Sequence, residues 1–206
     1  MSDLPAFFRL LFSYEEGLPL TFTQLFFWGF FLVVLAGFAL THKRIAVRNA
    51  WLFFASLFFY YKTSGLFVLI LLFSTVSDYS IALMIDSATS LTRKRLWLAL
   101  SVSVNLALLC YFKYAHFLIE NINGAFGTHY IEVNYFAQWS NGLFGTSHMV
   151  DRILLPVGIS FFTFQAISYA VDVYRGHIKP VRSILDFGFF VSFFPQLVAG
   201  PIVRAA

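Results

Sequence analysis

Polar side chains recur along one face of an apolar segment near the C-terminal end of the chain, residues 154–175. Four of them are spaced i, i+3, i+7 and i+10, which places them on one face of an α-helix. Polar groups on an otherwise apolar helix favour a polar-lined cavity over simple anchoring, because unsatisfied polar groups are costly in hydrocarbon. The four residues are Gln165, Ser168, Asp172 and Arg175.

This polar stripe also allows a purely structural interpretation. Asp172 and Arg175, at i and i+3, are close enough on a helix to form an ion pair with each other. Gln165 lies deeper and out of reach of bulk water, so its amide must hydrogen-bond within the protein or to a ligand. Both interpretations stay open at this point.

A shorter apolar segment, residues 187–199, follows the stripe and a basic patch at 175–182. It holds Pro195 and Gln196 and ends at Gly200-Pro201, where proline removes a donor and breaks a helix. About 13 apolar residues are typical of a re-entrant or partly crossing element. The break is either an ordinary helix end or a backbone opening that lines a cavity.

Asp78 is a further polar group inside an apolar segment, residues 65–85. Helical rise places it roughly 10 Å from the end of that segment. A carboxylate at this depth either lines a substrate path or makes a helix–helix hydrogen bond, to Tyr79, Asn105 or a backbone group.

Motifs for other chemistries are missing from the sequence. The single cysteine, Cys110, excludes an intrachain disulfide and a cysteine-based metal site. There is no Gly-rich phosphate loop, HExxH or GxSxG. None of the five histidines has a setting typical of a catalytic base, and His116, near the end of an apolar run, is the best placed of them for a membrane reaction. We therefore predict no catalytic residue and no metal site within these residues.

The elements that must position these polar groups are membrane helices. The chain is 59% hydrophobic, 20% aromatic and 12% charged, with 28 Phe in 206 residues and a mean hydropathy of +0.76. Several apolar runs approach the roughly 20 residues that cross a bilayer. The sequence predicts an all-α fold, a polytopic helical bundle of about five spans plus a re-entrant or sixth segment. The spans are expected at residues 20–40, 47–61, 65–85, 96–118 and 153–173.

Lys and Arg residues gather between the apolar runs, which is the topology signal of membrane proteins rather than a sign of nucleic-acid binding. The clusters at 42–48, 93–95 and 175–182 fall on one side, the cytoplasmic side by the positive-inside rule. The N-terminus and a polar connection at about 120–152, with a short surface helix near 135–143, then lie outside. We expect one domain, residues 1–206, in the inner (cytoplasmic) membrane.

Residues 154–176, LLPVGISFFTFQAISYAVDVYRG, and 186–204, DFGFFVSFFPQLVAGPIVR, resemble the signature region of the membrane-bound O-acyltransferases, the MBOAT family. The similarity is closest to the bacterial branch that O-acetylates alginate, other exopolysaccharides or peptidoglycan. Residues 49–85 resemble the family's second and third helices. The resemblance covers most of the chain from about residue 45 onwards.

The resemblance implies an O-acyltransferase that moves an acyl group, most simply acetyl, from a cytoplasmic donor through a tunnel to a hydroxyl of a cell-envelope or exported polysaccharide. It implies acetyl-CoA or an acyl carrier protein as donor, no bound cofactor, and a periplasmic or membrane-anchored acetyl-transfer partner besides membrane lipid. Buried donors there would stabilise charge developing on the acyl carbonyl. The matching motif positions are Gln165, Asp172, Tyr174, Arg175, Gln196, Gly200 and Pro201.

The family's hallmark histidine, the proposed general base, lies downstream of the GPIVR motif. None of the five histidines of this chain occupies that position. We therefore expect the chain to be the N-terminal part of such an enzyme and inactive alone. The alternatives are a non-catalytic membrane scaffold, a lipid or glycan flippase subunit, or a transporter built on Asp78 and Asp172.

Overall fold

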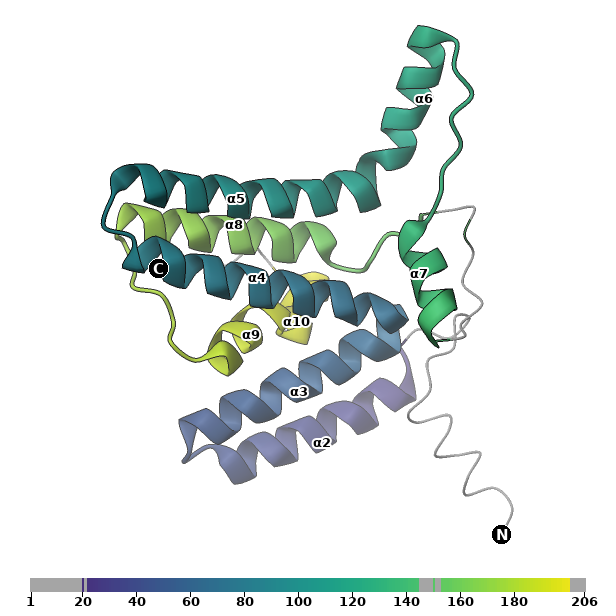
Figure 1. Ribbon diagram of the computed structural model, residues 1–206. Helices are drawn as coiled ribbons and strands as arrows, with labels where there is room; N and C mark the ends of the chain where they lie inside the picture. Colours follow the sequence, from purple (N-terminus) through teal and green to yellow (C-terminus); the bar gives the residue numbers. More distant parts are fainter. Residues whose placement is uncertain (1–19, 21, 145–149, 151–152, 201–206) are drawn as a thin grey trace.

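The computed structural model of the chain describes residues 20, 22–144, 150 and 153–200 (Figure 1). Every regular element within these ranges is a helix, so the prediction of an all-α fold is confirmed. Two continuous helical stretches among the described residues are long and apolar enough to cross a membrane, Ile45–Ser87 and Leu91–Phe126. Shorter apolar helices accompany them, and the number of spans stays a prediction.

The first three helices are apolar segments separated by short turns. Helix α2 (Leu25–Thr41) and helix α3 (Ile45–Ser64) form a hairpin, and helix α4 (Val68–Ser87) follows after a 3₁₀ turn. Gly65 ends α3 with a φ of 59°, a conformation that favours glycine. Helix α3 has 20 residues, about 30 Å of rise, enough to cross the hydrocarbon core.

The predicted span at 96–118 is not one straight helix. Helix α5 (Leu91–Leu109) ends in a π-helical turn, Cys110–Tyr114, and the chain bends there into helix α6 (Ala115–Phe126). In Figure 1, α6 projects away from the bundle, across the direction of α5. Helix α6 also occupies the first residues of the polar connection predicted from about 120, because its apolar residues recur on one helical face.

The C-terminal half holds four further helices. The surface helix predicted near 135–143 is present as α7 (Tyr135–Phe144). Helix α8 (Ile159–Arg175) begins later than the predicted span at 153, because Gly158 enters the helix in a left-handed conformation, φ 73°. The last apolar segment forms α9 (Ile184–Ser192) and α10 (Phe194–Ala199), which are separated at Phe193.

Helices α4, α5 and α8 pack side by side, and α9 packs between α3 and α4. A second apolar cluster joins α2, α3 and α10 through phenylalanine rings. The Phe59 ring lies 5.1 Å from the Phe194 ring and 6.0 Å from the Phe27 ring, between centroids. Edge-to-face and tilted contacts of this kind stabilise apolar packing beyond the area buried.

The turns that carry the basic clusters all lie at one end of the molecule. Figure 1 shows the α2–α3, α4–α5 and α8–α9 connections on the left, and the α3–α4 turn, the α5–α6 bend and α7 on the right. The fold therefore gathers the three Lys/Arg clusters at one end of the bundle, as the positive-inside rule requires of a membrane protein.

Candidate functional site

A break between α9 and α10 brings two of the predicted site residues together. Pro195 lacks the N–H that would continue the helix, and its ring clashes with the preceding turn. Helix α9 therefore ends at Ser192, and α10 begins at Phe194. In a continuous helix the carbonyl of Phe190 would accept a hydrogen bond from the N–H of Phe194, four residues on. The break separates these two groups, so each needs another partner.

Two polar side chains from other helices bind these separated backbone groups. Gln165 of α8 donates from Nε2 to the carbonyl oxygen of Phe190 at 2.8 Å. The N–H of Phe194 donates to Ser56 Oγ of α3 at 3.3 Å. Gln165 is 3% exposed and Ser56 is fully buried. The helix break is thus closed by protein groups, as an environment without water demands.

Gln165 also contacts Gln196 of α10, whose Nε2 donates to Gln165 Oε1 at 3.4 Å. The two amides connect α8, α9 and α10 at one point. The hydroxyl of Ser192, at the end of α9, is buried and has no hydrogen-bond partner among the described residues. The neighbourhood of the break therefore holds two amide groups and two buried hydroxyls, of which Ser56 is hydrogen-bonded and Ser192 has no partner among the described residues. The tunnel that the resemblance implies around them stays a prediction.

Two glycines allow the backbone to approach closely here. A Cβ on Gly158 would lie 2.8 Å from the carbonyl oxygen of Leu197, so α10 packs directly on the N-terminus of α8. A Cβ on Gly200, which follows α10, would lie 2.6 Å from the Cα of Gln196. The predicted site residue Pro201 lies outside the described residues.

Asp172, Tyr174 and Arg175 lie at the basic end of α8, about 10–15 Å from Gln165 by helical rise. Asp172 is largely buried, and its Oδ1 lies 3.5 Å from His177 Nδ1. Its Oδ2 is buried without a hydrogen-bond partner among the described residues. Gly176, in a left-handed conformation, ends the helix and turns the chain so that His177 faces Asp172.

Arg175 does not pair with Asp172 in the described part of the chain. It is exposed in the last turn of α8, where a cation stabilises the carbonyl end of a helix. Tyr174 accepts a hydrogen bond from Arg95 Nε of α5 at 3.5 Å. The predicted site is therefore divided between the helix break, with Gln165, Gln196 and Gly200, and the basic end of the bundle.

Asp78 forms a helix–helix hydrogen bond, which was one of the two roles predicted for it, the other being the lining of a substrate path. Asn105 Nδ2 donates to both carboxylate oxygens, at 2.8 and 3.0 Å, and Ser101 Oγ donates to Oδ1 at 2.7 Å. Ser74 Oγ adds a bond to Oδ2 at 3.2 Å. All four side chains are almost fully buried between α4 and α5. The carboxylate is saturated with donors from its own two helices, which is the geometry of a structural contact.

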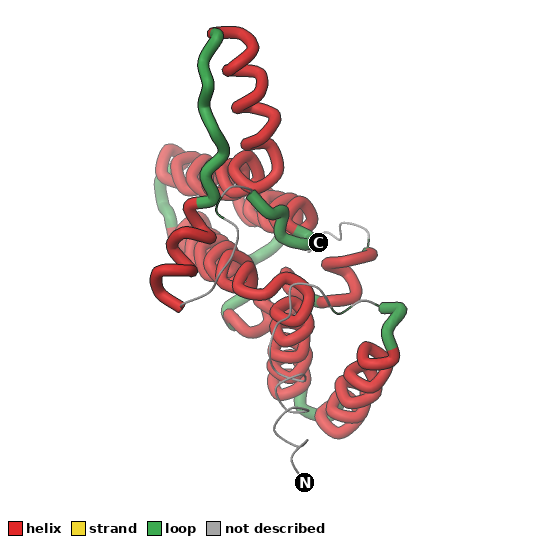
Figure 2. Tube along the Cα trace, turned by 90° about the vertical axis from the view of Figure 1, so that its right-hand side faces the viewer, coloured by secondary structure: helices red, strands yellow, loops and turns green. Residues whose placement is uncertain are grey.

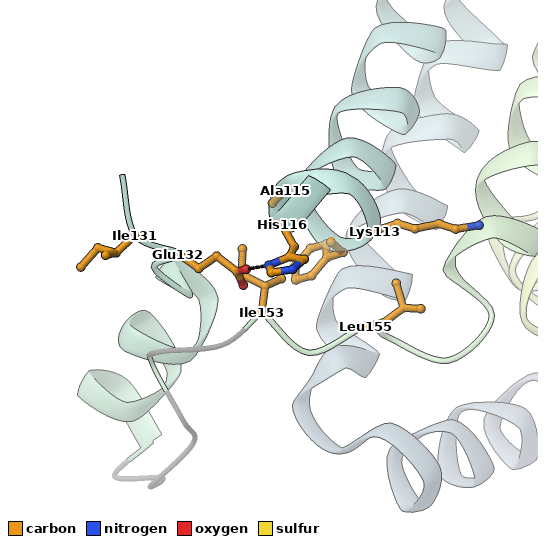
Figure 3. Close-up of a pocket in the computed structure, with 8 residues that line it drawn as sticks. Lys113, Ala115, His116, Ile131, Glu132, Ile153 and Leu155 are labelled. Atoms are coloured by element: carbon orange, nitrogen blue, oxygen red, sulfur yellow. Dashed lines mark hydrogen bonds and ion pairs between the residues drawn. The ribbon is translucent and has the colours of Figure 1, made fainter. Parts of the chain in front are cut away.

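A cavity of about 730 Å³ lies at the other end of the bundle, where the α5–α6 bend meets the segment before α8 (Figure 3). His116 lines it and lies against Glu132 through Nδ1, and its Nε2 lies 3.1 Å from Glu120. Phe112, Ile153 and Leu155 form apolar walls, and Lys113 reaches Ser160 Oγ at 3.4 Å. Gln165 and Asp172 do not line this cavity.

Sequence reasoning missed Ser56 and Gly158. Ser56 lies in an aromatic-rich helix where a single hydroxyl is unremarkable, and its partner Phe194 is 138 residues away. The role of Gly158 at the start of the helix could have been predicted locally, because Pro-Val-Gly directly before an apolar run is typical of a turn that precedes a helix. Its close approach to Leu197 depends on tertiary packing alone.

Long apolar helices, basic turns gathered at one end and a helix break closed by buried side chains are features typical of a helical membrane protein. No family model matches the chain, and no solved structure matches it. Several curated proteins do match the chain. A probable alginate O-acetylase of Pseudomonas aeruginosa is 38% identical over 184 residues, 88% of this chain and 32% of that protein. The corresponding protein of Pseudomonas syringae pv. tomato is 36% identical over 183 residues, again 88% and 32%.

A peptidoglycan O-acetyltransferase of Helicobacter pylori is 34% identical over 209 residues, 88% of this chain and 36% of that protein. These relatives confirm the resemblance to the bacterial O-acetylating branch of the membrane-bound O-acyltransferases, and the chain is homologous to them. It spans about a third of the length of the curated relatives that it matches.

Proposed function

We propose that the chain is part of a membrane-bound O-acetyltransferase that moves an acetyl group from a cytoplasmic donor to a hydroxyl of an envelope or exported polysaccharide. The observation that carries this proposal is the similarity, over 88% of the chain, to proteins named alginate O-acetylase and peptidoglycan O-acetyltransferase. The donor is acetyl-CoA or an acetylated carrier protein. An extracytoplasmic acetyl-transfer protein is the expected partner.

The contacts at the helix break suit such a reaction. An acyl carbonyl that is attacked by a hydroxyl develops negative charge on oxygen, and amide or hydroxyl donors in a water-poor site stabilise that charge. The amides of Gln165 and Gln196 and the unpartnered hydroxyl of Ser192 are donors of this kind. The proposed role of these residues is to bind and polarise the acyl group, while the general base lies elsewhere in the enzyme.

The basic end of the bundle suits a phosphate-bearing donor. Arg95, Arg175 and His177 are exposed there. Guanidinium groups bind phosphate through charge-assisted hydrogen bonds. We propose that this end faces the cytoplasm, that the membrane is the inner membrane, and that the N-terminus lies outside.

The test is to read the gene past codon 206 and to assay its complete product. Membranes that contain the complete product are expected to transfer label from acetyl-CoA to polysaccharide, and membranes that contain residues 1–206 alone are not. A complete product that transfers no acetyl group from either type of donor would overturn the proposal. Transfer by residues 1–206 alone would overturn the assignment of the base to another part of the enzyme.

A further inference from the structure

The bend between α5 and α6 follows from the length of the helical stretch. Leu91–Phe126 contains 36 residues, which would extend about 54 Å as a straight helix. The hydrocarbon core of a bilayer is about 30 Å thick, so α5 with its 19 residues already nearly spans it. The π-helical turn Cys110–Tyr114 redirects the remaining residues, and α6 leaves the bundle across the direction of α5 (Figure 1).

Helix α6 has a polar side that the chain itself covers. Asn123 donates from Nδ2 to the carbonyl of Tyr130 at 2.8 Å and accepts from the N–H of Tyr130 at 2.9 Å. His116 lies against Glu132 on the same returning segment. Figure 2 shows this segment and α6 side by side at the top of the view. In Figure 1 the segment lies on the side of α6 that faces away from α4, α5 and α8.

Another side of α6, apart from the contacts of Asn123 and His116, is apolar and exposed. Leu118, Ile122 and Phe126 recur at a spacing of four residues and are 44%, 42% and 77% exposed, and no residue of α6 is buried. Helix α6 begins directly after the end of α5 and the π-helical turn. At the level where a spanning helix ends, its surroundings are the upper acyl chains and the headgroups.

We propose that α6 is an interfacial helix, which lies along the bilayer surface at the end opposite the basic turns and inserts Leu118, Ile122 and Phe126 among lipid acyl chains. We assign lipid as the partner of this apolar side, because α6 begins where the spanning helix α5 ends and runs across the direction of α5. It has no Lys or Arg, and its only carboxylate is Glu120, so the attraction is apolar and needs no anionic lipid. The inference is independent of the acetyl-transfer proposal.

The test measures the depth of single nitroxide labels in the complete gene product reconstituted in phosphatidylcholine nanodiscs. Cys110→Ser, together with replacement of any cysteine elsewhere in the complete product, provides the cysteine-free background, and Leu118→Cys and Ile122→Cys report on the apolar side. Glu120→Cys, about 160° round the helix from the middle of the apolar side, is the matched control. Leu106→Cys on exposed α5 is the lipid reference, and Arg93→Cys is the water reference.

The ratio of oxygen to nickel-chelate collisions is expected to be at least about threefold higher at 118 and 122 than at 120. Addition of anionic lipid is expected to leave this ratio unchanged. Equal, water-like ratios on both sides would overturn the proposal, because α6 would then stand in solvent. Low collision rates with both agents at 118 and 122 would also overturn it, because protein would then cover the apolar side. Helical content and elution volume equal to those of the Cys110→Ser background establish that each variant is folded.

Discussion

At the scale of single residues, buried polar side chains in this protein close gaps in the backbone and join helices. Gln165 and Ser56 bind the two groups that the α9–α10 break releases. Asp78 collects donors from Ser74, Ser101 and Asn105. In both places these side chains hydrogen-bond to other groups of the protein, because lipid offers no partner. The two places differ in that the Asp78 carboxylate is saturated, whereas the break retains the unpartnered hydroxyl of Ser192.

Replacing Gln165 tests the closure of the break. Gln165→Leu keeps much of the side-chain volume but leaves the carbonyl of Phe190 buried without a donor, which is expected to cost about 1–3 kcal/mol of stability. The measurement is equilibrium unfolding in mixed micelles as the SDS fraction is raised, followed by circular dichroism.

Ser168→Ala is the matched control on the same helix. Among the described residues, the Ser168 hydroxyl bonds only to the carbonyl of Gln165 one turn away, at 2.8 Å. Its loss is therefore expected to change stability by no more than about 0.5 kcal/mol. Equal stability of the two variants would mean that the Gln165–Phe190 bond contributes nothing.

At the scale of elements, breaks and bends decide where the helices end. Pro195 divides one apolar segment into α9 and α10, and the π-helical turn divides another into α5 and α6. Gly158 has no Cβ, so the N-terminus of α8 can pack directly against α10. Each irregularity positions a polar group: the break places Gln196 beside Gln165, and the bend places His116 beside Glu132.

Gly158→Ala is expected to destabilise the contact between α8 and α10. The residue has a φ of 73°, which costs an L-residue about 1–2 kcal/mol, and the added Cβ would lie 2.8 Å from the carbonyl oxygen of Leu197. The same SDS unfolding assay measures the loss. Gly29→Ala, in α2 with open space around the added Cβ, is the control and is expected to be neutral or stabilising by up to about 1 kcal/mol. A Gly158→Ala variant as stable as the Gly29→Ala variant would contradict this packing.

At the scale of the whole molecule, the charge distribution predicts how the bundle is oriented in the membrane. The three basic clusters lie at one end, and α6, α7 and the cavity beside His116 lie at the other (Figure 1). The proposed reaction requires this polarity, because the donor is made in the cytoplasm and the acceptor polymer is outside.

Thiol labelling in intact cells tests the orientation. In a Cys110→Ser background, His129→Cys in the connection after α6 is expected to react with a membrane-impermeant maleimide added outside. Arg93→Cys in the first turn of α5, at the basic end of the bundle, is expected to react only after the cells are permeabilised. Both positions are exposed, so a difference reports sidedness rather than burial. The reverse pattern would show that the positive-inside prediction is wrong for this chain.

Much of the fold could be predicted from the order of residues. Runs of apolar residues near bilayer length predicted the helices, because a backbone in lipid must satisfy its hydrogen bonds within the segment. The surface helix at 135–144 and the likeness to O-acetyltransferases were also predicted, since both depend on local pattern. The bend at Cys110 was missed because residues 96–118 contain no Gly or Pro that would mark it, and composition does not report helix direction.

The sequence by itself determined that this protein is helical and membrane-bound, and it indicated which residues are too polar for lipid. It could show that Gln165 needed a partner, but not that the partner is the carbonyl of Phe190. Only the tertiary structure decided that pairing, together with the pairing of Asp78 with Asn105 and of Asp172 with His177 instead of Arg175. The physical reason is that hydropathy and helical period act within a segment, whereas a buried polar group is satisfied by whichever segment the packing places beside it.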